Sequence, residues 1–154
     1  MSLFIECKPD ETLAHVLGVP RKEIQHALGR ASVCAQLARR AGVTGMVDED
    51  PGSAEPPYLK SLTKLSWEHG IRVFSDPQRN NRIIMLSPRL EEWLVQSAKR
   101  AGLKLTDFGF ASDNGIQLHG EINQRLGSLE KLVKALLSVQ SPQLLRLQTW
   151  LTQP

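Results

Sequence analysis

Short apolar runs alternate with segments of helical character along the first two thirds of the chain. The runs have the length and composition of buried strands and lie at residues 2–6, 43–47, 71–74 and 82–86, with a weaker candidate at 23–28. The intervening segments predict helices over residues 11–17, 31–41, 58–69 and 88–101. This alternation predicts an α/β fold with a mainly parallel central sheet and flanking helices.

Turn-forming residues separate these predicted elements. Glycines follow four of the predicted helices, at Gly18, Gly42, Gly70 and Gly102, and Asp10 is placed to cap the first helix. Residues 50–57 (DPGSAEPP) predict a loop, because three prolines and a glycine prevent regular structure. Residues 75–81 (SDPQRNN) predict a β-hairpin or another tight connection between the two flanking runs.

The last third of the chain has a different pattern. A linker or lid is predicted at residues 103–114, followed by leucine-rich helices at 116–127, 128–139 and 142–151. The expected domain organisation is an α/β domain at residues 1–112 and a C-terminal helical extension at residues 113–154. The extension is expected to cover the sheet, and the alternative is contact with a protein partner or a second copy in a homodimer.

Composition narrows the class of protein without selecting a function. A chain of 154 residues with 41% hydrophobic and 23% charged residues suits an ordinary globular protein. A net charge of +3 permits a nucleic-acid partner without requiring one. Cys7 and Cys34 show no metal-type spacing and are expected to be reduced thiols. No stretch approaches the roughly 18 apolar residues of a membrane span, so no membrane association and a cytoplasmic location are expected.

Candidate chemistry lies in the acidic residues that follow two apolar runs. Asp48 and Asp50 stand one residue apart behind the run at 43–47, and Glu6 ends the run at the start of the chain. On a continuing strand the two aspartates would point to the same face and could share one Mg²⁺ or Mn²⁺ ion. A solvated acidic turn is the alternative for this pair. Two strand tips could therefore converge on one acidic cluster.

Four segments resemble the Toprim domain, the catalytic module of topoisomerases, bacterial primases and several small nucleases. Residues 3–11 (LFIECKPDE) resemble its opening strand, which ends in glutamate, and residues 45–50 (GMVDED) resemble its D-x-D strand. Residues 27–33 (ALGRASV) are similar to its glycine turn, and 85–94 (MLSPRLEEWL) resemble a segment of the stand-alone and phage-defence-type Toprim proteins. The resemblance covers about residues 2–102, and Cys7 stands where the family usually has glycine.

The resemblance implies a Toprim-like nuclease that hydrolyses phosphodiesters of DNA or RNA. Glu6 matches the acid/base residue of the family, and Asp48 and Asp50, together with Glu6, match its ligands for Mg²⁺ or Mn²⁺. Lys8 and Arg30 are candidates for binding backbone phosphate. The alternative is a catalytically inactive Toprim-like subunit that binds nucleic acid or a protein. A further alternative is an α/β domain with an acidic loop and no relation to the family.

Other residues are less promising as functional candidates. Glu91 could hold a second metal, but a glutamate at a helix start also stabilises the helix dipole. Trp67, Trp93 and Trp150 are spaced as core residues of helices, and they are expected to be buried.

Overall fold

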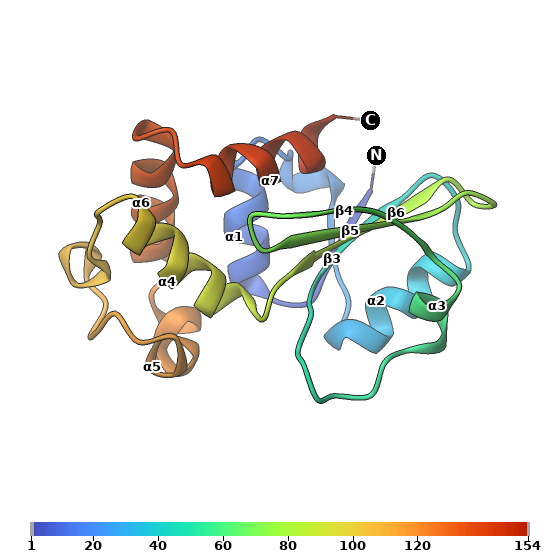
Figure 1. The fold of residues 1–154 in the computed structure, drawn as a ribbon, viewed down its shortest axis with the longest axis horizontal. Helices are drawn as coiled ribbons and strands as arrows, with labels where there is room; N and C mark the ends of the chain where they lie inside the picture. Colours follow the sequence, from blue (N-terminus) through green and yellow to red (C-terminus); the bar gives the residue numbers. More distant parts are fainter. Residues whose placement is uncertain (1, 154) are drawn as a thin grey trace. The chain divides into compact units, whose positions relative to one another are not determined.

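A six-stranded mixed sheet forms the centre of the α/β part of the chain (Figure 1). The computed structural model describes residues 2–153. The strands lie in the order β2-β1-β3-β6-β5-β4. Their bounds are β1 Leu3–Ile5, β2 Ile24–His26, β3 Thr44–Asp48, β4 Thr63–Glu68, β5 Ile71–Asp76 and β6 Asn81–Leu86.

The α/β class is confirmed, but the mainly parallel sheet is not. β2, β1, β3 and β6 run parallel, whereas β5 is antiparallel to both β6 and β4. Crossovers through helices give parallel neighbours, and tight hairpins give antiparallel ones. After β3 the chain passes through α3 to β4 at the far edge, and β4, β5 and β6 then follow one another as hairpins, which makes the sheet mixed.

Helices account for most of the remaining chain. Their bounds are α1 Lys8–Val16, α2 Gly29–Ala38, α3 Pro57–Lys60, α4 Leu90–Arg100, α5 Gly115–Glu121, α6 Leu126–Ser138 and α7 Pro142–Thr152. Short 3₁₀ turns lie at Arg21–Glu23, Leu105–Phe108 and Ile122–Gln124. Within residues 2–153, every helix is too short or too polar to cross a bilayer.

The chain forms two compact units, each made from two separate segments. The first unit contains Met1–Cys7 and Pro20–Pro88, which hold the whole sheet with α2 and α3. The second contains Lys8–Val19 and Arg89–Pro154, in which α1 packs against α6. Compact units need not coincide with independently folding domains, so the predicted boundary between residues 112 and 113 stays a prediction.

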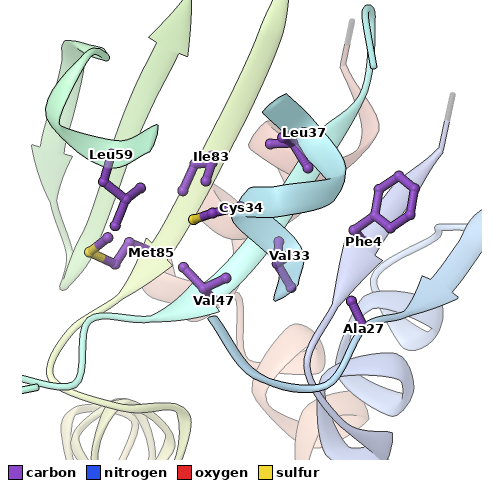
Figure 2. Close-up of a cluster of buried hydrophobic side chains, with 9 residues drawn as sticks. All are labelled: Phe4, Ala27, Val33, Cys34, Leu37, Val47, Leu59, Ile83 and Met85. Atoms are coloured by element: carbon purple, nitrogen blue, oxygen red, sulfur yellow. The ribbon is translucent and has the colours of Figure 1, made fainter. Parts of the chain in front are cut away.

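One face of the sheet carries α2 in the first unit. Figure 2 shows the apolar cluster between them, in which Val33, Cys34 and Leu37 of α2 meet side chains of the sheet. The cluster also contains Phe4, Ala27, Val47, Leu59, Ile83 and Met85. Gly45 of β3 lies directly under α2, and a Cβ there would come within 2.8 Å of Val33 Cγ1. The missing side chain therefore lets α2 approach the strand closely.

The predicted helix at 58–69 is wrong beyond its first turn. Only Pro57–Lys60 is helical, and Thr63–Glu68 forms the edge strand β4, paired with β5. His69 and Gly70 both have positive φ, 56° and 71°, as a tight turn between antiparallel strands requires. Trp67 is consequently 58% exposed on β4, which contradicts its predicted burial, whereas Trp93 is buried as predicted.

Several predicted helix boundaries also need correction. The helix predicted from residue 88 begins at Leu90, so Pro88 does not open it. Because α1 starts at Lys8, Asp10 lies inside the helix and does not cap it. The Asp10 side chain is also buried. The second helix ends at Ala38, three residues before the predicted end. The predicted helix at 116–127 is interrupted after Glu121 by a 3₁₀ turn, and Arg125 leaves helical geometry before α6 begins.

Candidate active-site edge of the sheet

The carboxyl ends of β1 and β3 are the place where this topology favours a ligand site. β1 lies between β2 and β3, and all three strands are parallel. The chain passes from β1 to β2 on one side and then returns across β1 to β3, so the strand order reverses at β1 and β3. In open α/β sheets, ligands bind outside the carboxyl ends of the strands at this switch point.

Glu6 and Asp48 occupy this switch point. Glu6 directly follows β1, Asp48 is the last residue of β3, and the register pairs Ile5 with Met46. A Glu6 carboxylate oxygen, Oε2, accepts a hydrogen bond from the backbone N–H of Asp48 at 3.0 Å. The structure therefore brings the Glu6 carboxylate to the tip of β3. Both residues are partly exposed.

Asp50 lies in a turn beyond the strand. Its φ of 50° is in the left-handed region, and its N–H donates to Pro88 O at 2.9 Å. Its carbonyl accepts from the backbone N–H and the hydroxyl of Ser53. Because β3 ends at Asp48, strand alternation does not extend to Asp50 and does not place the two aspartates on one face.

The carboxylates at this edge could bind a divalent cation only if waters or substrate oxygens supply its other ligands. Among residues 2–153, three or more His, Cys, Asp or Glu side chains are nowhere grouped as a metal site. Mg²⁺ needs only one or two carboxylates when waters and substrate phosphate complete its shell. Glu6 and Asp48 lie on adjacent strand tips and are joined by a hydrogen bond from the Asp48 amide to the Glu6 carboxylate. Binding of Mg²⁺ or Mn²⁺ by Glu6, Asp48 and Asp50 stays a prediction.

Arg30 holds the loop that follows β3. Its guanidinium donates to Glu49 O, to Ser53 Oγ at 2.8 Å and to Ala54 O at 2.9 Å. These bonds place a positive charge beside the acidic edge and fix the course of the loop. Lys8 is exposed at the start of α1, in the second compact unit. Phosphate binding by Arg30 and Lys8 stays a prediction.

Glu49 is a feature of this edge that the sequence pattern did not reveal. Its Oε1 accepts from Ser87 Oγ at 2.7 Å, and its Oε2 pairs with Arg72 Nη1 at 3.0 Å. Its backbone N–H donates to Leu86 O at 2.9 Å. Both side-chain partners lie more than 20 residues away in the chain, so spacing around Glu49 gives no signal of them.

Cys34 lies in the apolar layer and is close enough to the edge to respond to its charges. Burial raises the pKa of the Cys34 thiol to about 11, Arg30 lowers it and Glu6 raises it. The thiol is therefore protonated at neutral pH and is a poor nucleophile. Cys7, which follows Glu6, is partly exposed.

Glu91 lies in the second compact unit, at the start of α4. It is buried, and its Oε1 is 2.8 Å from His119 Nδ1 of α5. Oε2 is also buried and has no hydrogen-bond partner. A role of Glu91 in binding a second metal stays a prediction.

Comparison of the chain with models of protein families, with curated proteins and with solved structures finds no match. The resemblance to the Toprim family stays a prediction.

Proposed function

We propose that this protein hydrolyses phosphodiester bonds of nucleic acid in a reaction that depends on Mg²⁺ or Mn²⁺. The proposal rests on two acid-bearing strand tips that lie on adjacent strands at the switch point of the sheet. Glu6 follows β1, Asp48 ends β3, and a hydrogen bond joins them. The Toprim resemblance of the segments around these residues gives the same assignment. Glu6, Asp48 and Asp50 would hold the ion.

The residues of the edge would have distinct tasks. A divalent cation bound there would stabilise negative charge on a phosphate oxygen during in-line attack by water. Glu6 is assigned to proton transfer, and the Asp48 amide orients its carboxylate through the 3.0 Å hydrogen bond. Arg30 stabilises the loop containing Asp50 through its bonds to Glu49, Ser53 and Ala54.

A second candidate is a nucleic-acid-binding subunit without hydrolytic activity. One oxygen of Glu6 is already engaged by a backbone amide, which is also what a purely structural carboxylate does. Cys7 stands at the position where the related motif has glycine, so the backbone beside Glu6 carries a side chain. In this candidate the protein binds nucleic acid but does not hydrolyse it.

Cleavage assays with matched variants test the first candidate. Labelled single- and double-stranded DNA and RNA are incubated with Mn²⁺ or Mg²⁺ and the wild type, Glu6→Gln, Asp48→Asn or Glu55→Gln. Removal of a proton-transfer group should slow cleavage about 10²- to 10⁴-fold in Glu6→Gln. Exposed Glu55, in the loop after Asp50, is the control and should cleave like the wild type. Equal cleavage by the wild type and both site variants would exclude this assignment.

Metal binding is measured separately by thermal unfolding. An ion that binds only the folded wild type stabilises it by about 2.7 kcal/mol at one hundred times its Kd. Asp48→Asn should lose most of this stabilisation, and Glu55→Gln should keep it. Binding of nucleic acid without a metal response and without cleavage would favour the second candidate.

A further inference from the structure

We propose that Lys64, Trp67 and Arg72 form a stacking platform for single-stranded nucleic acid beside the acidic edge. This inference rests on the proposed function for the class of ligand and adds the surface that would bind it. All three residues belong to the β4–β5 hairpin in the first compact unit.

Trp67 is a large aromatic residue that the fold leaves in solvent. It lies on the edge strand β4 and is 58% exposed, whereas Trp93 is only 1% exposed. A side chain of this size contributes most to binding when a partner covers it. Its flat ring is the kind of group on which nucleobases stack irrespective of sequence.

An irregularity in β4 places the cations around this ring. Lys64 pairs with Phe74 and Trp67 with Arg72, and the register shifts between Lys64 and Ser66. Phe74 and Arg72 are two residues apart on β5 and share a face, so the shift brings Lys64 and Trp67 to that same face. In a regular strand, residues three apart would point to opposite faces.

The charges on this face suit a partner that combines aromatic rings with negative charge. Arg72 Cζ lies 3.8 Å from the Trp67 ring centroid, and Lys64 Nζ lies 5.3 Å from it. Both cations are within the range of cation–π attraction. Arg72 is also paired with Glu49, so Lys64 is the cation assigned to phosphate. A single strand offers exposed base faces together with phosphates, whereas the bases of a duplex are stacked on one another.

The platform is connected directly to the acidic edge. Arg72 Nη1 pairs with Glu49 Oε2 at 3.0 Å, and Glu49 directly follows Asp48. The sheet register agrees, because Arg72 pairs with Met85 near the carboxyl end of β6. A strand stacked on Trp67 would therefore have its neighbouring phosphates at the end of the sheet that carries Asp48.

Binding without metal tests the platform independently of hydrolysis. Fluorescence anisotropy of a labelled twelve-residue oligothymidylate and a blunt duplex is measured in EDTA at low salt. Trp67→Ala should weaken single-strand binding about 5- to 150-fold, the range for the loss of one base stack. Trp67→Phe should retain most of the affinity, and Lys64→Ala should weaken binding and reduce its salt dependence.

The controls separate this proposal from loss of fold and from failure of the proposed function. Leu28→Ala removes another exposed apolar side chain, 89% exposed, and should bind like the wild type. Thermal unfolding of each variant monitors folding, and because the assay contains EDTA its outcome does not depend on hydrolysis. Equal binding by Trp67→Ala, no preference for the single strand, or no oligonucleotide binding by the wild type would overturn the proposal. Self-association through Trp67 in place of oligonucleotide binding, detected by sedimentation, would also overturn it.

Discussion

Asp76 shows how a single side chain can stabilise the junction of several elements. Its carboxylate accepts from the Tyr58 hydroxyl at 2.9 Å, the Arg79 backbone N–H at 3.2 Å and Arg79 Nη1 at 3.3 Å. Asn81 continues the network by donating to Leu37 O at 2.8 Å and Arg40 O at 2.9 Å. These bonds connect the β5–β6 hairpin to α3 and to the end of α2.

The ionisation states of Asp76 and Tyr58 follow from their surroundings. Burial alone would raise the pKa of Asp76, but the hydrogen bonds from Tyr58 and Arg79 outweigh it and lower the pKa below the ordinary value of 3.8. For Tyr58, burial is the main cause that raises the pKa to about 12; the Asn81 hydrogen bond lowers it, whereas the bond to Asp76 raises it. The network is built for an ionised aspartate and a neutral tyrosine.

The first prediction concerns the acid stability of Asp76→Asn. Because the folded pKa of Asp76 is lower than its unfolded value, its ionisation stabilises the fold above that unfolded value. This stabilisation should be lost as the pH falls through the folded pKa. Melting temperatures from pH 7 to pH 2.5 should therefore fall less steeply below about pH 4 in Asp76→Asn than in the wild type. Asp107→Asn, at an exposed position, is the control, and identical acid slopes for Asp76→Asn and the wild type would contradict the prediction.

The β4–β5 hairpin is the element on which the sequence pattern was most misleading. Within β4 most side chains are exposed, so the strand lacks the alternation of buried and exposed positions that identifies a half-buried strand. Its identity depends on pairing with β5 and on the turn at His69 and Gly70. Intrinsic preference is weak in such an edge strand, and the neighbouring strand decides.

The second prediction tests this turn. Gly70 has a φ of 71°, a conformation that costs a residue with a Cβ about 1–2 kcal/mol. Gly70→Ala should lower the free energy of unfolding by that amount, measured by chemical denaturation. His69→Asn should change it by less than about 0.5 kcal/mol, because asparagine tolerates positive φ well. Equal effects of the two substitutions would contradict the predicted strain at Gly70.

At the scale of the whole molecule, elements that are adjacent in the sequence do not always belong to the same compact unit. α1 follows β1 directly, but it belongs to the second compact unit, where it packs against α6 about 110 residues later. The carbonyl of Leu17, just after α1, accepts from Gln148 Nε2 of α7 at 3.0 Å. The N-terminal helix therefore depends on the C-terminal helices for its partners.

The third prediction tests the boundary expected between residues 112 and 113. A fragment of residues 1–112 would lack α6, against which α1 packs, and α7. It should bind a hydrophobic dye, aggregate in size-exclusion chromatography and lose cooperative unfolding. The full chain is the control. A monomeric fragment with a sharp unfolding transition would instead support a domain that ends at residue 112.

Much of the first compact unit was predictable from local patterns. The apolar runs that form β1, β3, β5 and β6 can be identified from the sequence because buried strands need short, strongly apolar segments. The turn sequence at 75–81 predicts a hairpin or another tight connection, and β5 and β6 form a hairpin there. The acidic residues behind two of these runs then had to lie near strand ends.

The arrangement around those acids could not be obtained in the same way. The contact of Glu6 with the Asp48 amide depends on β1 and β3 being neighbours in register. The contact of Glu49 with Arg72 depends on the position of β5 in the sheet. The left-handed turn at Asp50 depends on bonds to Pro88 and Ser53. Each is a contact between segments that the local pattern does not connect.

The sequence by itself determined which short segments are apolar enough to be buried strands, and that acids stand at the ends of two of them. Only the tertiary structure decided that β4 is an edge strand with Trp67 in solvent, and that α1 joins the C-terminal helices. The physical reason is that burial depends on local hydrophobicity, whereas strand register, edge position and helix partners depend on residues far away in the chain.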